Sequence, residues 1–305
     1  MSVLGEMFTA GYIFNREDAL VVSITRSFQW SNKNGICKES PLAYARMGMA
    51  IACSLGDYDT GVSYGDAALK LLEFFNDKRL VSMTHLLVFA TISHWLRDVS
   101  VKPLLDGYEA GMAVGDTETA FFNIFFYLDH QLYTGIKPLS MLLEGYDHYA
   151  SKMEDHGQIS RCYMFGPRQA VANLIEGGSN PARLVGRYMD EEKFIEEGRQ
   201  GLYGTPSFIL GSISRYRMMT AFFFEDFECL FKIREEFSEA TVEKVSAGQF
   251  GLTFMVFTNA LAAVSQFRTT RHMKYKHIAA KLHRKLTRWV AAGVSANRTL
   301  IATTT

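Results

Sequence analysis

Proline and cysteine are scarce in this sequence, with six prolines and four cysteines among 305 residues. So few prolines argue against the many short, turn-bounded strands of a sandwich or barrel, and they favour long helices. The cysteines at positions 37, 53, 162 and 229 form no Cys-x-x-Cys pair and are too far apart to indicate a disulfide framework. We therefore expect an all-α chain in a reducing compartment.

Long apolar runs are also missing. The most apolar stretch, residues 252–267, contains five polar side chains and falls short of the roughly 18 consecutive apolar residues of a membrane span. The N-terminus carries no basic region before an apolar core, as a secretory signal would. These absences predict no membrane span, and a cytoplasmic location is the default expectation.

Acidic side chains are absent after Glu243. Ten of the 32 basic side chains follow it, so residues 1–243 carry 22 basic against 32 acidic side chains, a net charge of −10. Six of the later basic residues form a candidate patch: Arg271, Lys274, Lys281, Arg284, Lys285 and Arg288. The patch could attract nucleic acid or an acidic surface, or it could be a solvated helix face, as most basic runs are.

Motifs for catalysis or metal binding are missing or misplaced. Gly61–Gly65 reads Gly-x-Ser-x-Gly, as around the nucleophile of serine hydrolases, but Ser63 falls inside a predicted helix and not on a strand-to-helix turn. The chain has no Gly-Lys dipeptide and no Gly-x-Gly for a phosphate loop, and its eight histidines include no His-Glu-x-x-His. We therefore predict no catalytic residue, no metal ligand and no cofactor.

A helical hairpin is predicted at residues 40–75. Ser40 and Pro41 are suited to begin the first helix, Gly56 to end it, and Asp59 to cap the second. Small residues recur at spacings of three and four on one face of each helix, where they let two backbones approach closely. They are Ala45, Gly48 and Ala52 on the first helix and Gly61, Gly65 and Ala68 on the second.

Further helices are predicted along the rest of the chain. Their ranges are 79–97, 101–115, 117–133, 137–155, 158–175, 190–200, 206–223, 227–238, 241–267 with a break near Gly248 or Gly251, and 271–291. Residues 1–19 are a possible N-terminal helix or cap, 176–189 a loop, and 293–305 a disordered tail. Because an isolated helix pair cannot bury its apolar face, we expect one domain, residues 1–305, of stacked pairs.

The hairpin resembles a tetratricopeptide unit, a helix–turn–helix repeat of 34 residues. With Gly56–Tyr58 in the turn, the small residues of the second helix take positions where that repeat carries small or packing side chains. A similar turn recurs at Phe224–Phe227, and Tyr58 and Phe227 are 169 residues apart, close to five repeats. The resemblance implies a right-handed α-α superhelix, or solenoid, of antiparallel helix pairs.

Residues 20–75, His94-Trp95 with Lys102-Pro103, and Arg284–Trp289 are similar to the helical-repeat region of large signalling proteins. In those proteins the region follows a kinase-like domain and a STAND-type or AAA-type ATPase, and it precedes sensor, histidine kinase or nucleotide cyclase domains. The similarity spans about residues 20–292 and includes none of the catalytic domains. It implies a non-catalytic scaffold for protein–protein or interdomain interaction, whose partner is a protein or a neighbouring ATPase or kinase module.

Two arginines are the candidate protein-binding residues. Arg46 falls on the inner face of the first hairpin helix, and Arg215 takes the equivalent register in the later unit. Paired arginines on a concave wall could bind a partner carboxylate through forked hydrogen bonds, or they could form ordinary structural ion pairs. Two other functions stay open. One is nucleic-acid or acidic-surface binding through residues 268–291, and the other is an enzyme of unrecognised type, for which no nucleophile, base and anion site converge.

Overall fold

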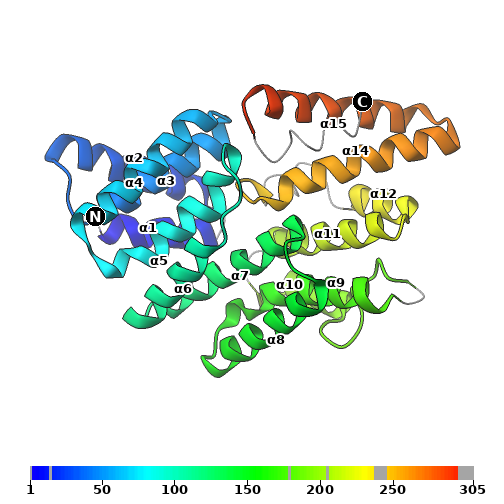
Figure 1. The fold of residues 1–305 in the computed structure, drawn as a ribbon, viewed down its shortest axis with the longest axis horizontal. Coiled ribbons are helices and arrows are strands. Elements are labelled where there is room, and N and C mark those ends of the chain that lie inside the picture. The colour runs from blue at the N-terminus through cyan, green and yellow to red at the C-terminus, as the bar shows by residue number, and fades with distance from the viewer. Residues whose placement is uncertain (1, 14–15, 178–179, 204–205, 237–245, 295–305) are drawn as a thin grey trace. The chain divides into compact units, whose positions relative to one another are not determined.

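Helices form most of the chain described by the computed structural model, which covers residues 2–13, 16–177, 180–203, 206–236 and 246–294. Over these residues the extended pairing is limited to one isolated bridge between Val185 and Asp190. The chain divides into two compact units, residues 1–127 and 128–305 (Figure 1). The all-α prediction is confirmed, whereas the single continuous superhelix stays a prediction.

The first unit consists of helices that pack against their neighbours in sequence. Pairs form between α1 and α2, α3 and α4, and α5 and α6, and Phe8, Ile24 and Val62 contribute to their shared apolar core. The helix bounds are α1 Ser2–Ile13, α2 Glu17–Asn34, α3 Ser40–Ala50, α4 Tyr58–Phe75, α5 Val81–His85, α6 Lys102–Val114 and α7 Thr117–Thr134, which contains the unit boundary.

The predicted hairpin is α3 and α4, and its helices meet through glycine. A Cβ atom added at Gly48 would lie 2.7 Å from the carbonyl oxygen of Gly61, and one added at Gly61 would lie 2.7 Å from the Cβ of Ala52. Real Cβ atoms essentially never approach so closely, so the backbones can lie this near each other only because both positions lack a side chain. The small-residue contact inferred from the sequence is confirmed.

The caps of this hairpin differ in part from the prediction. Gly56 has φ +71° and ends the first helix in the left-handed conformation, as expected. Asp57 and not Asp59 caps α4, since its carboxylate accepts a 3.1 Å hydrogen bond from the Thr60 amide. Ser40 makes no capping bond to the helix. Its hydroxyl oxygen instead accepts a 2.9 Å hydrogen bond from the Cys37 amide.

Two π-helical turns interrupt helices that the sequence predicted as regular. One is Ile51–Leu55 at the end of α3, and the other is Leu86–Ala90, which follows α5 within the predicted helix 79–97. A 3₁₀ turn at Ser93–Trp95 comes next, and there the Thr91 carbonyl accepts hydrogen bonds from the Trp95 indole at 3.2 Å and the Cys53 thiol at 3.6 Å. The bond from Cys53 links the first π-helical turn to Thr91, the residue that follows the second.

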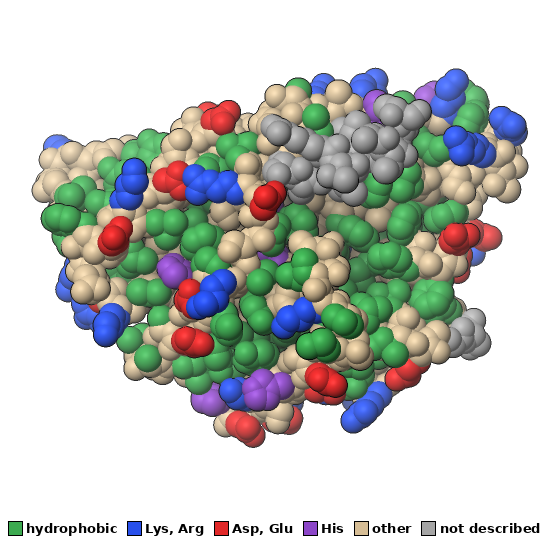
Figure 2. Space-filling view, in the orientation of Figure 1, with side chains coloured by type: hydrophobic (Ala, Val, Ile, Leu, Met, Phe, Trp, Pro, Cys, Tyr) green, Lys and Arg blue, Asp and Glu red, His purple; other side chains and the backbone are tan. Residues whose placement is uncertain are grey.

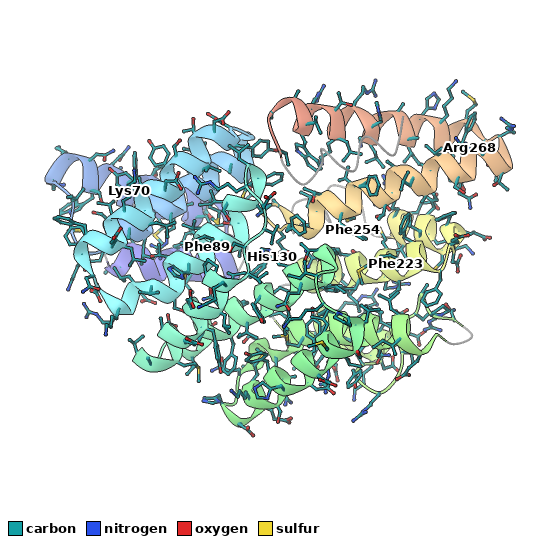
Figure 3. All side chains as sticks on the ribbon, in the orientation of Figure 1. Lys70, Phe89, His130, Phe223, Phe254 and Arg268 are labelled. Carbon is teal, nitrogen blue, oxygen red and sulfur yellow. The ribbon has the colours of Figure 1, made fainter. Side chains whose placement is uncertain are left out.

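The second unit continues the helical pattern close to the predicted ranges. Its helices are α8 Leu139–Asp155, α9 Cys162–Glu176, α10 Glu191–Arg199, α11 Pro206–Phe223, α12 Phe227–Glu236, α14 Gly251–Thr270 and α15 Met273–Ala291. Phe223 of α11 and Phe254 of α14 stack with ring centroids 6.0 Å apart (Figure 3). No described helix combines the length and the apolar character needed to cross a membrane.

Two helix starts in this unit are located more exactly by the structure than by the sequence. The predicted break in 241–267 falls at Gly248, where φ is +80°, so that α14 starts at Gly251. The predicted helix 271–291 starts at Met273, because Arg271 takes a left-handed conformation that turns the chain from α14 into α15. Residues 237–245, and 295–305 of the predicted tail, lie outside the described residues.

Candidate functional site

Arg46 is buried in the first unit, with 5% of its surface exposed. Its guanidinium carbon lies 4.4 Å from the centre of the Phe8 ring of α1, so helix α1 covers the inner face of α3. Burial lowers the pKa of Arg46 to about 10, and the nearby charge of Glu6 opposes that change. The cation therefore lies against an aromatic ring with the charge of Glu6 nearby, and it is buried away from a partner.

Arg215 is buried in the second unit, with 2% exposed, among polar side chains of four helical segments. Its guanidinium donates to the hydroxyl of Tyr216 at 3.2 Å, and that hydroxyl donates to the Asp129 carboxylate at 2.8 Å. A second guanidinium nitrogen donates to the side-chain carbonyl of Gln249. The hydroxyl of Tyr216 thus bridges the opposite charges of Arg215 and Asp129.

The rest of this polar cluster is equally enclosed. One oxygen of Asp129 and the hydroxyls of Tyr133 and Tyr146 are buried without a hydrogen-bond partner among the described residues. Burial raises the pKa of Asp129, against the opposing charge of Arg215, and it raises the pKa values of both tyrosines. Burial and the charge of Arg215 lower the pKa of His130 to about 3. The tyrosines and His130 are therefore neutral near pH 7.

The two candidate arginines do not form an exposed carboxylate-binding wall. Each guanidinium is buried within its own unit, against Phe8 for Arg46 and against Tyr216 for Arg215. These contacts fit the alternative that both arginines have a structural role. Both arginines are buried, and the sequence could not show that Phe8 of α1 would cover Arg46 or that Asp129 would lie near Arg215.

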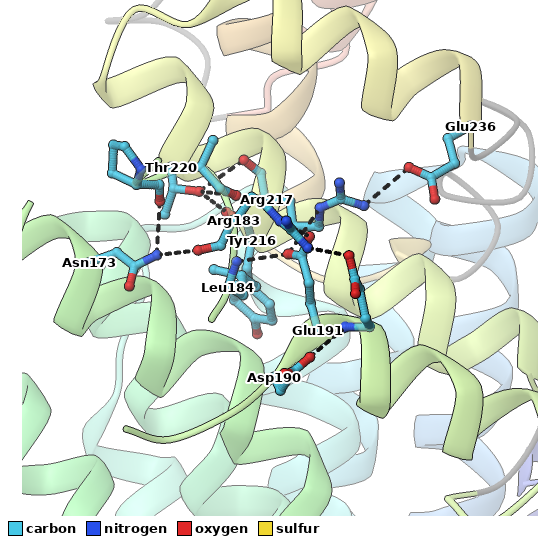
Figure 4. A network of polar contacts seen from close by, with 12 residues as sticks. Asn173, Arg183, Leu184, Asp190, Glu191, Tyr216, Arg217, Thr220 and Glu236 are labelled. Carbon is cyan, nitrogen blue, oxygen red and sulfur yellow. Dashed lines mark hydrogen bonds and ion pairs between the residues drawn. The ribbon is translucent and has the colours of Figure 1, made fainter. Parts of the chain in front are cut away.

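The loop between α9 and α10 is held by Glu191, a residue that the sequence did not single out (Figure 4). Glu191 is 3% exposed, and its carboxylate accepts a 2.7 Å hydrogen bond from the Leu184 amide. It also pairs with Arg217 at 3.3 Å and Arg183 at 3.4 Å. A buried carboxylate with an amide and two guanidinium partners fixes this loop to the helix α11 behind it.

Two amides of α9 hold the same loop from the other side. Asn173 donates to the carbonyls of Pro181 at 2.9 Å and Arg183 at 2.7 Å. The Gln169 carbonyl accepts from the Tyr188 amide at 2.9 Å, close to Gly186, where an added Cβ would lie 2.6 Å from the Gln169 amide nitrogen. Residues 180–190 are irregular, as predicted, but several of their backbone polar groups bond to the side chains of Gln169, Asn173 and Glu191.

The basic patch lies on α15 with one exception. Leu282, Leu286 and Trp289 are buried against the unit, and Lys274, Lys281, Arg284 and Arg288 are exposed. Lys285 is half-buried, with its ammonium 5.1 Å from the centre of the Trp289 ring. Arg271 is exposed but precedes the helix. In Figure 2, lysine and arginine side chains lie along the edge that α15 forms in Figure 1.

Helix α2 carries the most exposed tryptophan of the described chain. Trp30 is 56% exposed, whereas Trp95 and Trp289 are buried. Val21 and Val22 on the same helix are also exposed. This surface could not be predicted from the sequence, because α2 has an ordinary mixture of polar and apolar residues and only its packing shows which side is exposed.

The described residues contain no metal-ligand group at these sites or elsewhere. Among the described residues, no three histidine, cysteine or acidic side chains are grouped so as to hold a metal ion. Comparison of the chain with family models, with curated proteins and with solved structures found no match.

Proposed function

We propose that this chain is a non-catalytic helical-repeat scaffold that mediates protein–protein or interdomain interaction in a signalling ATPase or kinase assembly. In this proposal its helix pairs form a right-handed, tetratricopeptide-like superhelix in the cytoplasm. Support comes from the α3–α4 hairpin, whose close approach at Gly48 and Gly61 has the character expected of such a repeat. The ATPase or kinase assembly is proposed because residues 20–292 resemble the helical-repeat region of large signalling proteins.

The observation that carries the proposal is the exposed row on α2. Val22, Arg26 and Trp30 follow each other at intervals of four residues, so they lie in one row along the helix, and Val21 lies beside it. All four side chains are exposed. Tryptophan and arginine are the residue types most enriched where binding energy concentrates in protein interfaces.

The occupant that fits this row is an amphipathic helix of the partner protein or module. Helix α2 already packs against α1 and α3, and its buried Ser23, Ser27 and Ser31 follow each other at the same interval of four. A partner helix on the outer side would continue the same packing. The exposed Arg26 within the row favours an acidic side chain on that helix.

The test is site-specific photo-crosslinking from position 30 of the full chain in cells. We expect a defined crosslinked partner from position 30 that is lost in the Val22→Glu variant, since a carboxylate in the row would oppose an apolar helix with acidic side chains. The matched control is Ile159→Glu, at an exposed isoleucine outside the row. Equal crosslinking in wild type and Val22→Glu would refute the role of α2.

A further inference from the structure

Helix α15 presents three kinds of side chain around its axis. Its apolar row packs against the unit, and the opposite side carries Arg284, His277 and Met273 together with small residues at 280, 287 and 291, all exposed. At 100° per residue, the other exposed cations lie on the two flanks between these rows. One flank carries Lys274, Lys281 and Arg288, and the other carries Lys276 and His283.

The charge around this helix is of one sign. No acidic residue follows Glu243 in the sequence, so neither α14 nor α15 contains a carboxylate. The neighbouring α12 contributes Glu235, which pairs with Lys274 at 3.5 Å, and both side chains are exposed. Lys276 is exposed too, with its ammonium 6.0 Å from the centre of the Phe267 ring of α14.

We propose that α15 binds in the major groove of double-stranded DNA and contacts the phosphates of both strands. A helix with its side chains is about 10–12 Å across, and the major groove of B-form DNA is about 12 Å wide. Arg284 and the small residues Ala280, Thr287 and Ala291 beside it would face the floor of this groove. The cations on the two flanks then face the two phosphate backbones that border it.

The arrangement discriminates against other polyanions. The major groove of A-form RNA is too deep and narrow for side chains to read. Single strands are bound by stacking on exposed aromatic rings, but Trp289 is buried and Tyr275 is half-buried, 4.9 Å from Phe231.

The contacts involve phosphates and no identified base, so binding depends strongly on salt. Each phosphate contact contributes about 0.9 to the slope of log K against log salt concentration, which is about eightfold in affinity at 0.1 M salt. The Lys281→Gln, Arg288→Gln variant should therefore bind about 60-fold more weakly, with a slope smaller by about 1.8. Lys276→Gln, on the other flank, should lose about eightfold and about 0.9 of slope.

The experiment is fluorescence anisotropy of the full chain with a 20-base-pair duplex of mixed sequence between 50 and 200 mM KCl. The matched control is Lys70→Gln, Lys78→Gln, two exposed lysines of the first unit, which should bind like wild type. All the substitutions are at surface positions, and circular dichroism checks that each variant is folded.

Three results would overturn the proposal. One is a duplex affinity that is the same in wild type and in both flank variants. Another is binding to a single strand of equal length as tight as binding to the duplex. The last is binding to vesicles that contain phosphatidylserine, sensitive to the flank variants, without binding to the duplex.

Discussion

At the scale of single residues, the buried pair of Arg215 and Asp129 is the most consequential feature. Both side chains are shielded from water, and the hydroxyl of Tyr216 connects them. Removing one charge from such a pair leaves the other buried and uncompensated, which costs far more than removing both. The stability of the second unit should therefore depend on the pair being complete.

Arg215→Met should destabilise the chain by about 3–5 kcal/mol, because Asp129 loses its opposing charge. The double variant Arg215→Met, Asp129→Leu should recover most of this loss, because no buried charge remains. Urea unfolding of wild type and both variants measures the difference. If the double variant is no more stable than the single one, the pair is not the cause.

The pH dependence of stability should carry a contribution from His130. The pKa of His130 is about 3 in the folded chain against 6.5 ordinarily. Below pH 6.5 the histidine is therefore protonated in the unfolded chain but stays neutral in the folded chain. This contribution to the free energy of unfolding falls as the pH decreases, by about 2 kcal/mol between pH 7 and pH 5.

His130→Phe should remove that fall, and phenylalanine has a ring of suitable size beside Phe250, whose ring centroid lies 5.7 Å from that of His130. The measurement is the urea unfolding free energy at pH 7 and pH 5. The matched control is His148→Phe at an exposed histidine, which should keep the dependence of wild type. The same slope in His130→Phe and wild type would contradict the assignment.

At the scale of elements, the α3–α4 hairpin depends on its glycine contacts. Gly48→Ala places a methyl group 2.7 Å from the Gly61 carbonyl oxygen, so the helices must separate, at a cost of about 1–3 kcal/mol. Gly5→Ala in α1 is the matched control, because its nearest atoms are 3.7 Å away and alanine favours helix. Thermal melting should show a loss for Gly48→Ala only, and equal effects would argue against the close contact.

The loop between α9 and α10 depends on Glu191. Glu191→Gln keeps the shape of the side chain but weakens its bonds to Leu184 and Arg217, so trypsin should cut after the exposed Arg187 several times faster. Glu192→Gln, at the exposed neighbour, is the control. Mass spectrometry of a limited digest identifies the cut. Unchanged cleavage in Glu191→Gln would mean that the other contacts suffice.

The sequence predicted elements better than it predicted surroundings. Gly56, Pro41 and the glycines of the hairpin act through local geometry, so the α3–α4 pair could be inferred from spacing alone. The π-helical turns could not, since they are accompanied by tertiary contacts such as the hydrogen bond from Cys53 to Thr91. The cap at Asp57 is local, and the prediction missed it by placing the start of α4 two residues too late. The burial of Arg46 and Arg215 could not be predicted either, because it involves partners distant in sequence, Phe8 and Asp129.

At the scale of the whole molecule, two exposed surfaces stand out within their own units. The first unit offers the row on α2 around Trp30, and the second offers the cationic flanks of α15. Neither contains a catalytic arrangement, and each is a side of a helix whose other side is packed. The proposed function uses α2 to bind a protein helix, and the separate proposal for α15 is that it binds DNA.

The most direct test of the account is the fluorescence of Trp30 in the complex with the partner that position 30 crosslinks. Trp30 is 56% exposed, while Trp95 and Trp289 are 2% and 7% exposed, so acrylamide quenching reports mainly on Trp30. We predict that the bound partner shields Trp30 from acrylamide, so that quenching of the wild-type chain falls to that of the Trp30→Phe variant. Quenching that is unchanged when the partner is bound would show that α2 is not the binding surface.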